Sequence, residues 1–270
     1  MLLSLYAPAA PVHGFCYLRV NSSMRERKES AKQSATKDDA EEAVNDFRVR
    51  SARRKREKMR ARLMEAMLRV CAERQGLPTV IDEVTQEAKV SRGTFYNYFD
   101  SLEQLTEAIG TKLSDDLSEE ALRLMPEISQ GLLGTAAGIR LLLSRAAVDP
   151  VWGSFVVHSD FLNPDTTVGR LARQNLAEGH ASAHFVFALY EVAIDVVLGS
   201  IREGVRRLLV GGIESDLYIY QLSIHILQAL GVPHSAARSA TEEVYTYFLR
   251  NAPGRLEWWP SSPARASKRT

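Results

Sequence analysis

The sequence predicts an all-α protein with a helix-turn-helix segment near its N-terminal end. Apolar residues recur every three or four positions along most of the chain, and turn signals separate these stretches. No stretch of useful length alternates apolar and polar residues as a β-strand would. The 270 residues, 45% of them hydrophobic, are enough to bury a sizeable core in one or two domains.

The N-terminal helix is expected to begin near Ala52. Met59, Leu63, Met67 and Val70 recur at helical spacing opposite a face rich in Arg and Lys. The sequence QGLP then stops the helix, because glycine suits a C-terminal cap and proline cannot continue a helix.

Three cap signals follow at close intervals. Thr79, with Asp82 three positions on, can cap a helix of about ten residues. Ser91 can cap a short helix that runs to Phe99, and Ser101 can open a longer helix from the next residue. Short helices joined by tight turns are the layout of a helix-turn-helix motif.

The rest of the chain is predicted to be helical as well. The turn signals Asp149-Pro150, Asn163-Pro164, Gly179, Gly211-Gly212 and Gly231 mark the boundaries, with a further break at Pro126. The expected helices cover residues 131–147, 150–159, 166–178, 186–210, 214–230 and 234–250.

Both ends of the chain differ from this pattern. Residues 1–51 are predicted to be a disordered extension, because residues 21–46 are rich in Ser, Lys, Glu and Asp. Met24 begins the segment MRERKES, and one hypothesis makes residues 1–23 an upstream addition to the native chain. Residues 252–270 are predicted to form a loose tail, from which Trp258 and Trp259 are expected to dock on the body.

Positive charge is concentrated near the N-terminal end. Residues 1–100 hold 19 Lys and Arg against 14 Asp and Glu, whereas residues 101–270 hold 15 against 19. The segment from Arg48 to Arg74 alone contains 11 basic residues and three Glu. Such a distribution is typical of a protein that faces a polyanion, and a solvated helix face has the same composition.

The cysteines and the apolar runs indicate a cytoplasmic protein without a membrane partner. Cys16 and Cys71 are too few for a disulfide framework and lack metal-binding spacing, which favours a reducing compartment. The N-terminal stretch MLLSLYAPAAPVHGF has no basic segment and does not read as a signal peptide. The apolar run Phe185 to Gly199 contains Glu191 and Asp195 and is too short to span a bilayer.

The run TVIDEVTQEAKVSRGTFYNYFDSLEQL joins the turn, the short helix and the start of the next helix. With the basic amphipathic helix before it, this run resembles the N-terminal domain of the tetracycline-repressor (TetR) family of bacterial transcription regulators. The resemblance covers Ala52 to Leu105, and the later residues agree only in being helical and of suitable length. It implies a three-helix DNA-binding domain at residues 52–101 and a helical effector-binding and dimerisation domain at residues 102–251.

Two positions depart from the family pattern. Lys89 stands where a glycine is usual in the turn, and a side chain there has a conformational cost if φ is positive. Leu102 stands where a lysine is usual, which would remove one phosphate contact per subunit.

The short helix is expected to divide its residues between a core face and a DNA face. Phe95 and Phe99 lie four positions apart and are expected to pack inward. By the resemblance, Arg92 would bind guanine and Asn97 would bind adenine or phosphate in the major groove. Tyr98, and less strongly Tyr96, would contact phosphate. The residues expected at the DNA interface are Arg53, Arg54, Thr79, Ser91, Arg92, Gly93, Thr94, Tyr96, Asn97 and Tyr98.

The resemblance also implies partners. One such motif buries too little DNA for a strong specific site, so a homodimer on a near-palindromic double-stranded operator is expected. The helices at 186–210 and 214–230 are the expected dimer elements. Their apolar stripes comprise Leu189, Ala193, Val196, Val197, Ile201, Leu217, Tyr220, Ile224 and Leu227.

A small, mostly apolar effector is expected to bind inside the second domain and to favour a conformation that releases DNA. Ordinary core packing is an equal alternative for each candidate lining residue. The candidates are Trp152, Phe155, His158, Phe187 and Tyr190, with Asn175 and Asp195 as further polar anchors.

Other classes of function remain open. The same fold serves activators as well as repressors, and a member could act through protein contacts without binding DNA. His180 and His184 could share a metal, but they lack the glutamate of a metalloprotease motif. No nucleophile elbow, phosphate loop or catalytic carboxylate pair stands out. We therefore expect no enzyme activity, cofactor or metal.

Overall fold

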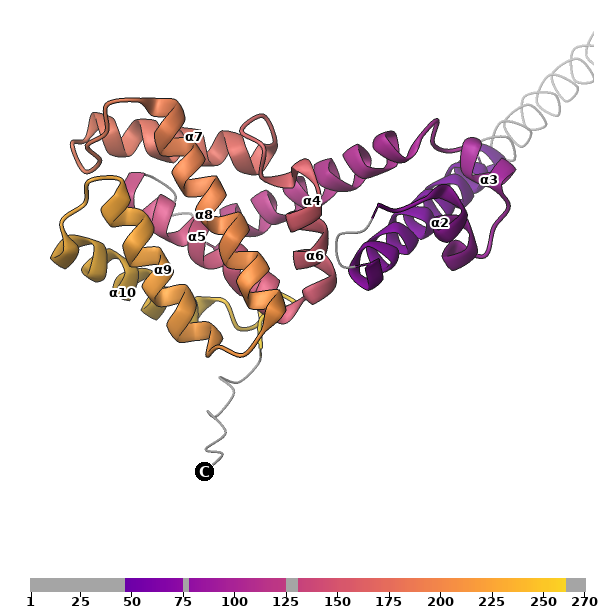
Figure 1. Cartoon of the computed structure of the whole chain (residues 1–270). Coiled ribbons are helices and arrows are strands. Elements are labelled where there is room, and N and C mark those ends of the chain that lie inside the picture. The colour runs from indigo at the N-terminus through magenta and orange to yellow at the C-terminus, as the bar shows by residue number, and fades with distance from the viewer. Residues whose placement is uncertain (1–46, 75–77, 125–130, 261–270) are drawn as a thin grey trace, which may run out of the picture. The chain divides into compact units, whose positions relative to one another are not determined.

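The computed structural model describes residues 47–74, 78–124 and 131–260, and every regular element within these ranges is a helix (Figure 1). Two compact units divide between Met59 and Arg60. Residues 47–74 are helical. The later helices are α2 (Ile81–Ala88), α3 (Arg92–Tyr96), α4 (Leu102–Leu124), α5 (Gly131–Val148), α6 (Pro150–His158), the 3₁₀ helix η1 (Asp160–Leu162), α7 (Thr167–Ala181), α8 (Tyr190–Val210), α9 (Ser215–Ala229) and α10 (His234–Asn251).

The predicted helix boundaries agree with the structure at most positions. The chain is already helical at residue 47, so the last five residues of the predicted disordered extension are helical instead. The hypothesis on residues 1–23, the QGLP stop at residues 75–78 and the break at Pro126 lie wholly or mostly outside the described residues.

The caps of the helix-turn-helix follow the prediction at two of three positions. The Ser91 hydroxyl accepts a hydrogen bond from the Thr94 amide at 3.1 Å, and Ser101 caps α4 by accepting from the Gln104 amide at 3.2 Å. The predicted cap at Thr79 is wrong, because the N-cap of α2 is Val80. The Val80 amide donates to the Glu83 carboxylate at 3.2 Å, so a glutamate inside the helix reaches back to the cap residue.

Lys89 ends α2 in the left-handed conformation, with φ 52° and ψ 49°. This confirms the positive φ on which the expected conformational cost of lysine at this position depends. Its amide bonds to the Gln86 carbonyl at 3.0 Å, and the next amide bonds to Thr85 at 2.9 Å, so the turn is well formed despite the Cβ.

We expect Lys89→Gly to raise the free energy of unfolding by up to about 1 kcal/mol. Relief of left-handed strain contributes about 1–2 kcal/mol, and the greater freedom of unfolded glycine removes part of it. Urea denaturation followed by circular dichroism measures the change. A loss of stability would show that the lysine side chain makes contacts that outweigh the strain.

The second half of the chain packs α5 against α7, α8, α9 and α10. α5 is long and apolar enough to cross a membrane by length and composition alone. Two-thirds of it is buried inside the protein, which is the pattern of a core helix.

Two helix ends differ from the prediction for one shared reason. α7 continues through Gly179 to Ala181, and α8 begins at Tyr190 instead of residue 186. A Cβ on Gly179 would lie 2.2 Å from the Phe185 ring, which is buried there. The glycine therefore serves close packing of the returning chain and not a helix end.

The C-terminal tail is ordered as far as residue 260, contrary to the predicted loose segment. Leu256 is buried, and Trp259 packs on Phe248 with ring centroids 5.6 Å apart. The Trp258 indole donates to the Glu120 carboxylate at 2.8 Å, so the expected docking of both tryptophans is confirmed. Residues 261–270 lie outside the described residues.

The apolar stripes predicted for dimer contact belong mostly to the core of one protomer. Helical periodicity marks a buried face without saying what buries it. Five members are at most 3% exposed: Ala193, Val197, Ile201, Ile224 and Leu227. Leu189 and Leu217 are more than half exposed, and so is Val192, which the stripes did not include.

Candidate nucleic-acid interface and ligand pocket

Two buried aromatic rings hold the short helix α3 in place. Phe95 and Phe99 are 0% and 1% exposed, which confirms their predicted place in the core. Their ring centroids lie 6.1 Å apart, and the Arg60 guanidinium lies 4.4 Å over the Phe99 ring. A five-residue helix cannot hold itself together in water, so these contacts fix its position.

Polar residues occupy the opposite side of α3. Arg92, Gly93 and Asn97 are exposed, while Thr94 is partly buried and its hydroxyl lies 3.0 Å from that of Ser91. Because the Ser91 hydroxyl also caps α3, it has little capacity left for DNA. The structure thus brings the predicted base-reading residues to one exposed surface without showing what they contact.

The two tyrosines differ from each other. Tyr96 is 53% exposed and packs its ring edge-on against Phe95, with centroids 5.5 Å apart. Tyr98 is partly buried and packs against the core. Exposure therefore favours Tyr96 as the freer hydroxyl, and the role of each in phosphate contact stays a prediction.

Arg92 forms an ion pair with Asp82, which in the sequence is marked only as part of a helix-start signal. Asp82, in the first turn of α2, accepts hydrogen bonds from Arg92 through both carboxylate oxygens. One bond comes from Nε, and the other comes from Nη2 at 2.8 Å. The only sequence signal was an acidic side chain in a helix expected to face DNA.

Thr79 is partly buried and lies beside Cys71, with its hydroxyl oxygen 3.8 Å from the thiol sulfur. Burial raises the pKa of the Cys71 thiol, and the contact with Thr79 opposes this effect. The thiol therefore stays protonated at neutral pH, which makes a reactive cysteine here unfavourable.

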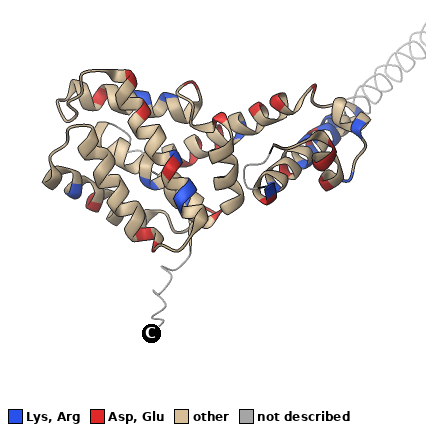
Figure 2. Ribbon diagram, in the orientation of Figure 1, with Lys and Arg blue, Asp and Glu red and all other residues tan. Residues whose placement is uncertain are grey.

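The basic helix before the motif carries its charge on an exposed surface. Figure 2 shows Lys and Arg gathered along this helix. Arg53 forms an ion pair with Glu57 at 2.8 Å, and both side chains are largely exposed. Arg54 is also exposed. Exposed pairs of this kind exchange partners readily, so they leave the basic residues available to phosphate.

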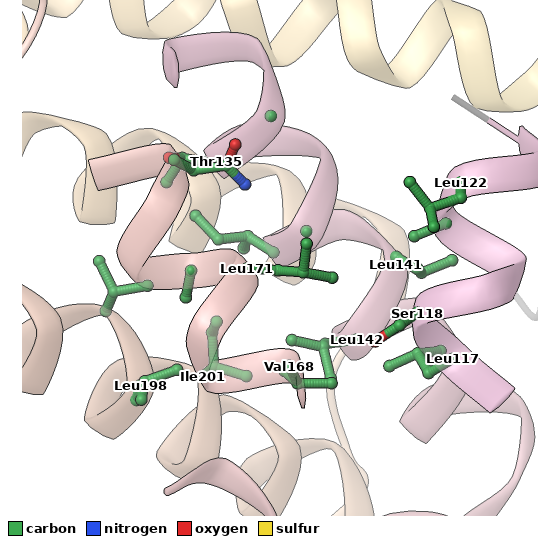
Figure 3. Close-up of a pocket in the computed structure, with 17 residues that line it drawn as sticks. Leu117, Ser118, Leu122, Thr135, Leu141, Leu142, Val168, Leu171, Leu198 and Ile201 are labelled. Atoms are coloured by element: carbon green, nitrogen blue, oxygen red, sulfur yellow. The ribbon is translucent and has the colours of Figure 1, made fainter. Parts of the chain in front are cut away.

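A second candidate site is a cavity of about 90 Å³ enclosed by α4, α5, α7 and α8 (Figure 3). The labelled side chains around it are mainly aliphatic: Leu117, Leu122, Leu141, Leu142, Val168, Leu171, Leu198 and Ile201. Gly134 and Gly138 of α5 also line it. The lining contains no charged side chain, so the cavity suits an uncharged, mostly apolar molecule.

Three polar side chains line this cavity, and only Asn175 has donors that are not already engaged. The Ser118 and Thr135 hydroxyls donate to the carbonyls of Ser114 and Gly131, at 2.7 and 2.9 Å. Asn175 of α7 is partly buried, and no described residue forms a hydrogen bond with its amide. Asn175 is therefore the best placed group to orient a polar atom of a ligand.

The five residues predicted for the effector lie elsewhere. Trp152 is buried and packs its ring edge against Phe161 at 5.3 Å, while Phe187 stacks on His180 at 4.6 Å. Tyr190 donates to the Arg173 carbonyl at 2.5 Å. Phe155 and His158 line a wider hollow of about 830 Å³ that includes many polar residues. Aromatic content alone thus marked core positions, whereas the cavity is lined by aliphatic residues and glycine.

The two histidines considered as metal ligands each contact a nearby residue through Nδ1. His180 lies 3.3 Å from the Phe185 carbonyl through Nδ1, and His184 lies 2.8 Å from the Ser182 hydroxyl through Nδ1. Among the described residues, no three His, Cys, Asp or Glu side chains are grouped as metal ligands would be.

Comparisons with known proteins bear on the fold and on the helix-turn-helix segment. Residues 64–109 match the family of bacterial regulatory proteins called the tetR family. No curated protein matches the chain. The structure of RolR with the ligand resorcinol is similar, with a TM-score of 0.54 and 24% identity, covering 70% of this chain and 95% of that chain. The structure of RolR without ligand is also similar, with a TM-score of 0.51 and 23% identity, covering 67% of this chain and 96% of that chain.

The likeness to RolR supports the overall fold, and the family match falls on the helices that build the reading surface. That surface consists of the short polar helix α3, which two buried phenylalanines hold in place. Residues 64–109 therefore carry the helix-turn-helix domain of the tetR family of bacterial regulatory proteins.

Proposed function

We propose that the protein is a homodimeric repressor that binds a near-palindromic operator and is released by a small, mostly apolar effector. The proposal of DNA binding rests on the exposed polar surface of α3, which Phe95 and Phe99 hold in place. Arg92, Gly93, Thr94 and Asn97 would meet base edges there, with Tyr96, Tyr98 and Thr79 beside phosphates.

The dimer is proposed to form through the outward faces of α8 and α9. Leu189, Val192 and Leu217 are more than half exposed on or beside these helices. Exposed apolar side chains favour association when a second copy can cover them. A twofold dimer would present two α3 helices to successive major grooves.

The effector is proposed to bind the cavity among α4, α5, α7 and α8. Its aliphatic lining and the unpartnered Asn175 amide fit a small uncharged molecule with one or two polar atoms. RolR, of similar fold, binds resorcinol, a small aromatic diol, and a compound of that size class is a reasonable first probe.

Selection of bound DNA from a random pool tests the central proposal. A palindromic consensus is expected, because a dimer reads two equivalent half-sites. An asymmetric consensus would contradict the dimer model, and the absence of any consensus would favour a member that acts through protein contacts. A promoter fusion carrying the selected site separates the repressor from the alternative activator.

We expect Gly138→Leu to abolish the response to an effector while leaving DNA binding intact. A Cβ at Gly138 meets no atom within 4 Å, so the added side chain can occupy the cavity without a backbone clash. Titration of small phenols into the complex with operator DNA measures release. Gly138→Ala is the matched control, since it adds only a methyl group. Equal release by both variants would place the effector elsewhere.

A further inference from the structure

We propose that Asp82 is a specificity-determining residue, which positions Arg92 to read guanine. This inference rests on the proposed DNA-binding function and adds a member to its reading surface. Asp82 lies on α2 and Arg92 on α3, so the pair links the two helices of the helix-turn-helix.

The Asp82 carboxylate occupies one of the two hydrogen-bonding edges of the Arg92 guanidinium. Arg92 donates to Asp82 through Nε and Nη2, which form the side edge of the planar group. The end edge, formed by Nη1 and the second Nη2 hydrogen, donates no hydrogen bond to any described residue. A guanidinium has five donors, so one carboxylate leaves three of them available.

The free end edge matches the chemistry of guanine. O6 and N7 of guanine lie side by side in the major groove, and two parallel N–H groups of arginine can bind both. A carboxylate on the side edge and a guanine on the end edge can therefore be bound together. The pair found in the free protein is compatible with base reading and does not have to break.

If Asp82 holds Arg92 in place before DNA binds, it affects whether Arg92 contacts a base or a phosphate. A free arginine on an exposed helix has many rotamers and can reach the DNA backbone, which carries no sequence information. The Asp82 carboxylate limits those rotamers before binding and so lowers the entropy lost on contact with guanine. A negative group next to Arg92 also disfavours a swing toward a phosphate. Asp82 should thus affect the choice of base more than total affinity.

The side chains of Asp82 and Arg92 are 63% and 64% exposed, so stabilising the fold is a poor explanation for their ion pair. Exposed ion pairs contribute little to stability, so removal of Asp82 should leave the fold unchanged. A second ion pair on α2 offers a control of similar kind. Glu87 pairs with Arg69 at 2.5 Å, and both side chains are partly exposed.

The experiment uses the full chain and compares base preference among Asp82→Ala, Asp82→Asn, Arg92→Ala, the double variant and Glu87→Gln. Each is tested by selection from a random pool, followed by competition between the consensus site and single-base substitutions. Thermal melts by circular dichroism check that all variants are folded.

We expect Arg92→Ala to remove the preference for guanine at one position in each half-site. Asp82→Ala should reduce that preference by about three- to tenfold, a part of the discrimination that one bidentate contact supplies. Asp82→Asn should behave similarly, because an amide cannot accept from both Nε and Nη2. In the Arg92→Ala background, removal of Asp82 should change nothing further, and Glu87→Gln should retain the wild-type preference.

Three outcomes would overturn the inference. An equal gain in affinity of Asp82→Ala for every sequence, with the guanine preference intact, would make Asp82 a masking charge. Loss of a cytosine preference at a different position would make Asp82 a direct reader of the cytosine amino group. A wild-type protein that selects no consensus would contradict the proposed function itself, and this result is distinct from the other two.

Discussion

Phe95→Ala should lower the free energy of unfolding by about 3–5 kcal/mol, the usual cost of removing a fully buried phenylalanine side chain. Phe95 is 0% exposed and contacts the rings of Phe99 and Tyr96. It is also the only fully buried member of the five-residue helix α3. With that anchor removed, the helix has no independent stability, and binding to the selected operator should be lost.

Tyr96→Ala is the control, because it removes the neighbouring ring on the exposed side of the same helix. Tyr96 is half exposed, so its removal should cost far less stability than that of Phe95. Urea denaturation and an operator-binding assay together separate the two effects. Equal losses of stability would show that the rings share one role, contrary to the division between core and DNA faces.

The helix-turn-helix could be predicted from the sequence because its signals are local. Ser91 and Ser101 cap helices that begin at the next residue, and helical spacing placed Phe95 and Phe99 on one face. Even the unusual turn conformation of Lys89 could be anticipated from the residue that the turn ordinarily requires. Such features depend on interactions within about four residues, which sequence patterns report directly.

The ligand cavity and the reading pair could not be predicted, since both depend on contacts between distant segments. The cavity walls come from α4, α5, α7 and α8, which are far apart in the sequence, and Asn175 is the one expected effector residue that lines it. Asp82 and Arg92 meet only because the turn at Lys89 brings α2 and α3 together. Apolar periodicity likewise marked the stripes of α8 and α9 without revealing that their own protomer buries most of them.

Gly169→Ala should lower the free energy of unfolding by about 2–3 kcal/mol, within the range observed when atoms are forced into a packed interior. A Cβ at Gly169 would lie 2.2 Å from the Asn163 carbonyl oxygen and 2.7 Å from the Pro164 Cα. These are backbone atoms, and Thr166 fixes them by donating its hydroxyl to the Asn163 carbonyl at 2.8 Å. The clash cannot be relieved by rotating a side chain.

The same substitution should weaken effector binding, because Gly169 adjoins the cavity. The amide of the preceding Val168 donates to the Ser114 hydroxyl at 2.9 Å, and the Val168 side chain lines the cavity. Displacement of the start of α7 would disturb both.

Gly138→Ala provides the opposite case, since its Cβ meets no atom within 4 Å. Replacing an open glycine inside a helix should raise stability by about 0.5–1 kcal/mol. Chemical denaturation of the two variants should therefore give shifts of opposite sign, and shifts of the same sign would mean that close backbone contact at Gly169 does not decide its stability.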